Sequence, residues 1–263
     1  MTTELYFTAN FQILSFDVDY KGRAHLSALM NYLQDAARGH SIREKFSVFE
    51  LFEKGVTWVV SRYHLKINRY PVLGENILVK TWASGKNGYY ALRDFEAYDE
   101  KQNKILSATS SWMIIDLNTR RPVKVENLFP DELVLHQRAL EDDFPPLPIV
   151  ETLDYKADFR VLFEDLDFNR HVNNVVYSRW AVEGMPQEML FSGRPMTLEI
   201  NYRSEAFYGD EIEVITQKPV IPDGFWVQQI YNLKTGKEVA RLRSRWMRYE
   251  HLGNEGKNQD ETG

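Results

Sequence analysis

Two short stretches of this chain, Gly74-Glu75-Asn76-Ile77-Leu78-Val79 and Gly209-Asp210-Glu211-Ile212-Glu213-Val214, resemble each other at a spacing of 135 residues. A second pair follows them, because Ser110-Ser111-Trp112-Met113 resembles Ser244-Arg245-Trp246-Met247 at a spacing of 134 residues. Two matches in nearly the same register, each surrounded by elements in the same order, are better explained by duplication than by chance. We therefore interpret the 263-residue chain as a tandem repeat of one structural unit.

The elements around each copy predict a helix followed by an antiparallel meander. Residues 26–38 carry apolar side chains at helical spacing, and residues 173–189 carry a less regular apolar stripe. Strand-like runs separated by turn signals follow in each half, at 57–65, 77–82, 89–98 and 105–115, and at 196–202, 211–216, 226–233 and 239–249. A long helix wrapped by a curved antiparallel sheet is the hotdog architecture. We therefore predict an α+β fold built as a tandem, or double, hotdog.

The division of the chain follows from this repeat. We expect an N-terminal hotdog over residues 1–135 and a C-terminal hotdog over 153–250. The segment 136–152 between them is interpreted as a linker, because it contains the polar, proline-bearing run Asp142-Asp143-Phe144-Pro145-Pro146-Leu147-Pro148. Residues 251–263 are polar and rich in Gly, Asn and Glu, which predicts a disordered tail.

Composition excludes several classes of function. A net charge of −6 and a pI of about 5.6 disfavour nonspecific nucleic-acid binding. The chain has no cysteine, which excludes disulfides, thiolate metal sites and a cysteine nucleophile, and the 6 histidines show no metal-ligand spacing, so we expect no metal or cofactor. The first residues resemble neither a signal peptide nor a transit peptide, and no apolar run could span a bilayer. The sequence therefore predicts a cytoplasmic protein without a membrane partner.

Residues 165–180, which read DLDFNRHVNNVVYSRW, contain the best candidates for chemistry. Asp167, Asn169 and His171 are spaced two residues apart, directly before a stretch that can form a helix. A helix start offers unpaired N–H groups and partial positive charge, so these residues could activate a water and stabilise an oxyanion. Taken singly, each could instead serve in a turn, a cap or a structural role, and Asn173 and Asn174 are interpreted as helix caps and turn formers.

The first half lacks this set of residues. In one register Asp19, Lys21 and Arg23 align with the acid, amide and imidazole; in the other His25 aligns with the imidazole, and Lys21 and Arg23 with the acid and amide. In either register the first half would serve as sheet, pocket and scaffold. Glu205 follows a strand end, and its spacing alone favours an ordinary exposed charge slightly over a catalytic role.

With these motifs the chain resembles the acyl-ACP thioesterase family of plants and bacteria. The resemblance extends from about residue 5 to about residue 249 and includes the active-site motif quoted above. It also includes Trp58-Val59-Val60-Ser61-Arg62, Asn68-Arg69-Tyr70-Pro71-Val72-Leu73-Gly74-Glu75 and Tyr202-Arg203-Ser204-Glu205. Small single-hotdog acyl-CoA thioesterases share the His-Val-Asn-Asn core, but the double length and the other motifs distinguish the two groups.

The resemblance implies hydrolysis of the thioester between a fatty acyl chain and acyl carrier protein, with Asp167, Asn169, His171 and Glu205 as catalytic residues. Plant members carry a cysteine after this glutamate, whereas Ala206 stands here, so we expect direct attack by water. Either His171 or Glu205 would act as general base, Asp167 would orient a partner, and Asn169 with backbone N–H groups of 172–174 would bind the oxyanion.

The remaining expectations concern the pocket and the partner. We expect the acyl chain to lie between the helix and the sheet of the first half. The residues proposed to contact it are Met30, Leu33, Trp58, Val60 and Trp82. The alternative is that each of them only packs in the core. Acyl carrier protein is acidic, so we expect it to dock on a basic patch of this chain. The candidate residues are Arg120, Arg121, Lys124, Arg241, Arg243, Arg245 and Arg248. The alternative is that these residues only form a solvated surface.

Three other functions are compatible with such a fold. An acyl-CoA thioesterase would share the chemistry with a different carrier. A hydratase or dehydratase would also pair a histidine with an acid, and a lipid-binding hotdog would need no catalysis. Hotdog sheets often pair edge to edge, and the tandem chain provides that pairing internally, so the protein is expected to be a monomer or a homodimer.

Overall fold

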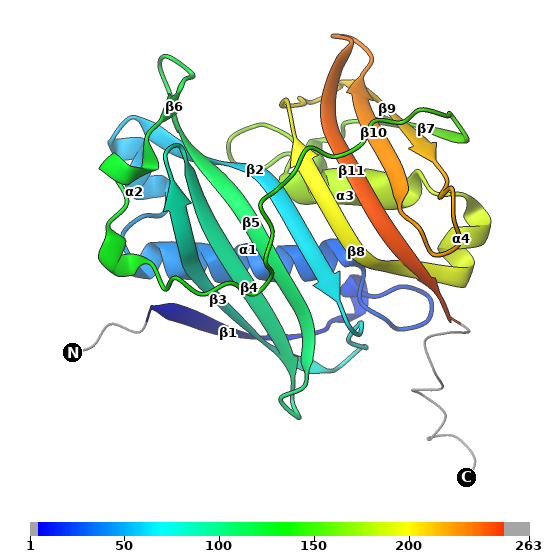
Figure 1. The fold of residues 1–263 in the computed structure, drawn as a ribbon, viewed down its shortest axis with the longest axis horizontal. Coiled ribbons are helices and arrows are strands. Elements are labelled where there is room, and N and C mark those ends of the chain that lie inside the picture. Colours follow the sequence, from blue (N-terminus) through cyan, green and yellow to red (C-terminus); the bar gives the residue numbers. More distant parts are fainter. Residues whose placement is uncertain (1–4, 250–263) are drawn as a thin grey trace.

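The computed structural model describes residues 5–249, which form helices packed behind one antiparallel sheet (Figure 1). The strands of the first half are β1 (Tyr6–Gln12), β2 (Val56–Ile67), β3 (Asn76–Asn87), β4 (Tyr90–Asp99), β5 (Lys104–Asp116) and β6 (Pro122–Val123). Those of the second half are β7 (Tyr155–Arg160), β8 (Gly193–Tyr202), β9 (Glu211–Gln217), β10 (Trp226–Asn232) and β11 (Lys237–Arg248).

The strand order reveals the duplication. The described residues form an 11-stranded sheet in the order β1-β3-β4-β5-β2-β8-β11-β10-β9-β7, with β6 paired to β5. The two halves of this order mirror each other about the β2–β8 junction, where five register pairs run from Arg62 opposite Asn201 to Lys66 opposite Thr197. The predicted double hotdog is therefore confirmed, and the sheet continues through the boundary between its two repeats.

Within the described residues, four α-helices cover one face of the sheet or its ends. They are α1 (Leu26–Arg43), α2 (Val48–Glu53), α3 (Asn174–Glu183) and α4 (Gln187–Ser192). The single helix expected over 173–189 is wrong, because it is divided into α3 and α4. The helix ends at Gly184, where a Cβ atom would approach Val214 Cγ1 to 2.7 Å, and Pro186, which cannot donate a helical hydrogen bond, caps α4.

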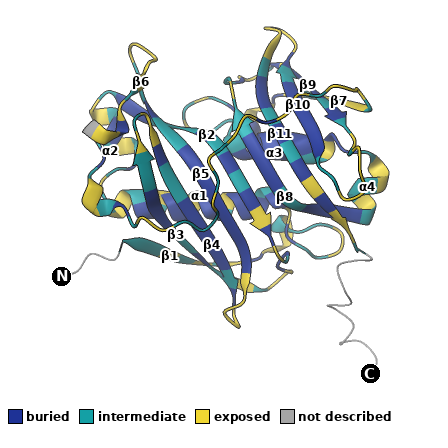
Figure 2. Ribbon diagram, viewed as in Figure 1, coloured by how far each residue is buried: buried dark blue, intermediate teal, exposed yellow. Residues whose placement is uncertain are grey.

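One hydrophobic core is shared by the two halves (Figure 2). It contains Leu33 and Phe95 from the first half together with Trp180 and Ile230 from the second, each at most 2% exposed. Apolar side chains of α1 and α3 face the same side of the sheet, so each half buries its helix partly against the other.

The outer strands β1 and β7 were missing from the expected elements. They pair with β3 and β9 and occupy the two edges of the sheet. Their residues alternate between half-buried and exposed, without the fully buried positions that mark the central strands. Short edge strands of this kind carry a weak apolar signal, which explains why their sequences did not identify them.

The segment 136–152, here called the linker strap, crosses the sheet face opposite the helices (Figure 1). Along its length, Asp142 accepts a hydrogen bond from His64 at 2.7 Å, and the Val150 N–H donates to Gln229 Oε1 at 2.9 Å. The expected linker is thus an ordered layer held by polar side chains of the sheet. The domain boundaries placed beside it stay predictions, and the tail predicted at 251–263 lies outside the described residues. Within residues 5–249, no helix is long and apolar enough to cross a membrane.

Asp94 anchors the start of the linker strap and provides a test of its contribution. This fully buried carboxylate accepts bonds from Ser84 and Thr109 on the sheet, at 2.9 and 2.6 Å, and from Arg138 and the Ala139 N–H on the strap, at 3.2 and 2.5 Å. We expect Asp94→Ala to lower the free energy of unfolding by about 3 kcal/mol, because it leaves a cation and three other donors without their buried partner.

The measurement is urea denaturation, with limited proteolysis of the strap alongside. The matched control is Asp143→Ala, which removes an exposed carboxylate from the same segment and should change stability by no more than about 0.5 kcal/mol. Equal denaturation midpoints for the two variants would contradict the anchoring role of Asp94.

Candidate active site

A compact loop before α3 displays the three candidate side chains. The Asp167 N–H donates to the His171 carbonyl at 2.9 Å, and the Arg170 N–H donates to the Asp167 carbonyl at 3.0 Å. The Asp167 carboxylate also accepts a hydrogen bond from the Asn169 N–H at 2.8 Å. This is the turn-forming role that the sequence offered as the alternative to catalysis for Asp167. Arg170 has a φ of +64°, and the loop reverses direction within these few residues.

The start of α3 uses most of its free N–H groups. The Asn173 side chain accepts the N–H two residues later, at 3.0 Å, so its predicted capping role is confirmed. The Val172 N–H donates to the Ala206 carbonyl at 2.9 Å, and the Asn173 N–H donates to the Asp165 carbonyl at 2.8 Å. Of the three N–H groups expected to bind an oxyanion, only that of Asn174 lacks an acceptor among residues 5–249.

The bond between Val172 and Ala206 brings Glu205 beside His171. Glu205 Oε1 lies 3.5 Å from His171 Nδ1, and both side chains are partly exposed, at 34% and 26%. The ring of Phe207 meets the imidazole edge-on, with centroids 5.3 Å apart. The structure therefore brings a carboxylate and an imidazole from separate elements within reach of a hydrogen bond, as the resemblance implied.

Tyr177 is a buried residue of α3 near these side chains. Its hydroxyl donates to the Ser204 carbonyl at 3.4 Å, and the side chain is 3% exposed. Burial raises the pKa of Tyr177, and the charges of Glu205 and Asp167 raise that pKa further. Both carboxylates therefore act on the same hydroxyl, which remains a neutral donor below them.

The first half folds into the same loop with different side chains. The Asp19 N–H donates to the Arg23 carbonyl at 2.8 Å, the Gly22 N–H to the Asp19 carbonyl at 2.9 Å, and the Lys21 N–H to the Asp19 carboxylate at 2.8 Å. Each of these bonds has a counterpart 148 residues later in the loop around Asp167. This settles the two registers in favour of Asp19, Lys21 and Arg23 at the positions of the acid, amide and imidazole.

In the first half, the place equivalent to the candidate site is filled by an arginine of the second half. Tyr70 stands at the position equivalent to Glu205. The Ala24 N–H donates to the carbonyl of Pro71, which follows Tyr70, just as the Val172 N–H donates to the carbonyl of Ala206, which follows Glu205. Arg194 is 6% exposed, pairs with the Asp19 carboxylate and lies over the Tyr70 ring at 4.5 Å. The duplicated position therefore joins the two halves where the other copy carries the candidate chemistry.

The five proposed pocket residues do not form one surface. Met30 and Leu33 belong to the shared core, and Val60 packs against it. Trp58 packs in a separate cluster near Phe129, and its indole donates to the Phe46 carbonyl at 2.9 Å. The Trp82 indole donates to the Gln137 carbonyl in the linker strap at 2.7 Å. Of the five, only Met30, Leu33 and Val60 belong to one cluster.

Two contacts across the halves reach the site and were missing from the expected set. Phe168, in the loop before α3, stacks on Phe49 of α2 with ring centroids 6.0 Å apart. Arg120, expected in a docking patch, binds the Glu205 carboxylate at 2.6 and 2.8 Å. No sequence signal identifies a pair of residues 85 positions apart, and the first half is therefore more than a scaffold.

Much of the expected docking patch is already paired within the chain. In the second half, Arg241 pairs with Glu238 at 2.7 Å and Arg243 with Glu199 at 2.8 Å. Arg121 and Lys124 remain exposed beside Arg120. These pairings leave less free positive charge on β11 than the sequence pattern indicated.

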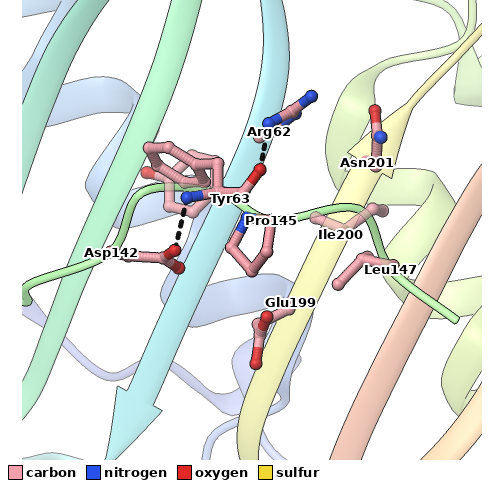
Figure 3. Close-up of a pocket in the computed structure, with 9 residues that line it drawn as sticks. Arg62, Tyr63, Asp142, Pro145, Leu147, Glu199, Ile200 and Asn201 are labelled. Atoms are coloured by element: carbon pink, nitrogen blue, oxygen red, sulfur yellow. Dashed lines mark hydrogen bonds between the residues drawn. The ribbon is translucent and has the colours of Figure 1, made fainter.

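A hollow between β2, β8 and the linker strap contains none of the catalytic candidates (Figure 3). Beside it, His64, Asp142 and Glu199 present possible metal-ligand atoms within 4.8 Å of one another. These groups are engaged already, since His64 bonds to Asp142 at 2.7 Å and Arg243 donates to Glu199 at 2.8 Å. The cluster is therefore accounted for by the attachment of the strap to the sheet.

Two hotdog repeats joined in one continuous sheet place this chain in the double-hotdog class of proteins. Residues 4–133 match the family model of the acyl-ACP thioesterase N-terminal domain, and residues 151–248 match that of the C-terminal domain. The chain belongs to the acyl-ACP thioesterase family.

Similar proteins occur in plants and bacteria. The chloroplastic palmitoyl-acyl carrier protein thioesterase of Cuphea hookeriana is 31% identical over 260 residues, which is 92% of this chain but 62% of the relative. The chain thus spans less than two thirds of that relative's length. An acyl-ACP thioesterase structure from Bacteroides thetaiotaomicron has a TM-score of 0.83 and 26% identity, covering 92% of this chain and 98% of that one. The 12:0-ACP thioesterase of Umbellularia californica has a TM-score of 0.81 and 26% identity, with 93% and 98% covered.

The buried arginine at the duplicated position should matter for stability. We expect Arg194→Met to lower the free energy of unfolding by about 3 kcal/mol, because it leaves the Asp19 carboxylate unpaired between the halves. The control is Arg248→Met, since Arg248 makes a solvent-exposed pair with Glu188 that should contribute at most about 1 kcal/mol. Urea denaturation measures both variants, and a midpoint for Arg194→Met equal to that of the control would contradict the prediction.

Proposed function

We propose that this protein hydrolyses the thioester of fatty acyl-acyl carrier protein to free fatty acid and the holo-carrier. The observation that carries the proposal is the approach of Glu205 Oε1 to His171 Nδ1, 3.5 Å apart at the start of α3. Family membership supports the substrate class, and the likeness to solved acyl-ACP thioesterases extends over 98% of their chains. The carrier and the acyl chain are part of the proposal.

In this mechanism His171 is the general base and Glu205 orients it. A carboxylate facing Nδ1 favours the ring tautomer with its proton on that nitrogen, which leaves Nε2 to accept a proton from water. As the water loses that proton, its oxygen attacks the thioester carbonyl and forms a tetrahedral oxyanion. When the C–S bond breaks, the imidazolium returns the proton to the departing thiolate. Ala206 follows Glu205, so no cysteine acyl-enzyme enters this route.

In this proposal the oxyanion is bound by hydrogen-bond donors that have no other acceptor in the loop. The Asn174 N–H stands at the start of α3 without an acceptor among the described residues, and the Asn169 side-chain amide can supply a second donor. Asp167 holds the shape of the loop through its bond to the Asn169 N–H. Its contribution is therefore to orient these partners, as the sequence suggested.

The acyl chain is proposed to lie between α1 and the sheet of the first half. Met30, Leu33 and Val60 share the apolar layer there and are kept as proposed contacts. Trp58 and Trp82 are left out, because they pack in other places. The cytoplasmic location and the choice between monomer and homodimer stay predictions.

The test is thiol release from acyl-ACPs of eight to eighteen carbons, with the matching acyl-CoAs assayed alongside. We expect release from acyl-ACP, and a fall of about a thousandfold in kcat for His171→Ala, because that variant lacks the base. The matched control is His136→Ala, which removes an exposed imidazole in the linker strap and should leave kcat unchanged.

Each alternative outcome identifies a different error. Release from acyl-CoA alone would replace the carrier protein by coenzyme A. Release that survives His171→Ala would overturn the assigned base. No release from either carrier would sink the thioesterase proposal and favour a hydratase or a lipid-binding role.

A further inference from the structure

The carboxylate of Glu205 has two partners, one from each half of the chain. Arg120 Nη2 lies 2.6 Å from Glu205 Oε1 and 2.8 Å from Oε2, so one guanidinium nitrogen bridges both oxygens. The same Oε1 lies 3.5 Å from His171 Nδ1. Arg120, Glu205 and His171 therefore form a continuous line of contacts that ends at the proposed base.

The turn that delivers Arg120 is strongly defined. Arg120 lies between β5 and β6, and its φ of +57° is one that residues other than glycine rarely adopt. Its N–H donates to the Asp116 carbonyl at 2.9 Å, while the Asp116 carboxylate accepts the N–H groups of Asn118 and Thr119 at 3.0 and 2.7 Å. These bonds lower the pKa of Asp116, so the carboxylate that fixes the turn remains charged. The turn therefore holds the backbone of Arg120 in one defined conformation.

We propose that Arg120 is a positioning residue of the active site, which holds the Glu205 carboxylate in the orientation that faces His171. The inference rests on the proposed function and assigns a catalytic task to the first half of the chain. Without Arg120, the Glu205 side chain has no cation to fix its terminal torsion. It would then spend less time aligned with Nδ1, and fewer molecules would have a base ready to accept a proton.

A comparison with Arg121 can distinguish the positioning of Glu205 from the docking of an acidic carrier protein. Arg121 follows Arg120 in the same turn, is exposed, and has no ion-pair partner within the described part of the chain. A docking cation would act on the association of the acidic carrier and hence on KM, with a strong dependence on salt. A positioning cation would act on kcat. Arg120→Ala and Arg121→Ala remove the same charge at adjacent positions and so form a matched pair.

The experiment is steady-state hydrolysis of acyl-ACP by the full chain and its variants. We expect Arg120→Ala to lower kcat by roughly ten- to a hundredfold with KM within about threefold of the parent value, and Arg120→Lys to recover part of that loss. Arg121→Ala should leave kcat unchanged. Thermal denaturation of each variant checks that it is folded, which the partial exposure of Arg120 favours.

A double-mutant cycle tests whether Arg120 acts through Glu205. In a Glu205→Ala background, Arg120→Ala should reduce kcat by less than about twofold, because the group it positions is already absent. Full multiplicative effects of the two substitutions would overturn the inference, as would a raised KM with unchanged kcat in Arg120→Ala. If the parent enzyme hydrolyses no thioester, the proposed function fails and this inference fails with it. If the parent is active and Arg120→Ala matches it, only the inference fails.

Discussion

The pairing of β2 with β8 is the constraint on which the rest of this structure depends. It joins the strands of the two halves into one sheet through backbone pairing that runs from Arg62 opposite Asn201 to Lys66 opposite Thr197. Because backbone pairing fixes register, it also fixes how the loops of one half meet those of the other. The shared core behind the junction, with α1 and α3 on the same face, stabilises this arrangement.

Duplication has preserved the backbone of the loop before each core helix while its side chains have diverged. Around Asp19 and around Asp167 the same hydrogen bonds recur, and a positive φ falls at Gly22 and at Arg170. In the second half this frame carries Asn169 and His171. In the first half, the equivalent surface is closed by Arg194. One backbone solution thus supports candidate catalysis in one copy and attachment between halves in the other.

The two halves contribute to one site in different ways. The second half supplies the groups proposed to carry out the chemistry, and the first half supplies Arg120 and the aromatic contact of Phe49 with Phe168. The pair of Arg120 with Glu205 is partly exposed, at 49% and 34%, so its net contribution to stability is expected to be at most about 1 kcal/mol. Orientation of a carboxylate, rather than stabilisation of the fold, is the effect that such a contact can provide.

The duplication could be predicted from the sequence because two motifs recur in nearly the same register. The double hotdog and the loop that contains Asp167, Asn169 and His171 could be predicted because periodicity, turn residues and local spacing are properties of neighbouring residues. The edge strands β1 and β7, the break after α3 and the separation of Trp58 and Trp82 from Met30 were decided by tertiary structure. The same holds for Arg120, which lies 85 residues from Glu205 and reaches it only because β2 and β8 align the halves. Contacts between distant segments depend on strand register and packing, which no local pattern encodes.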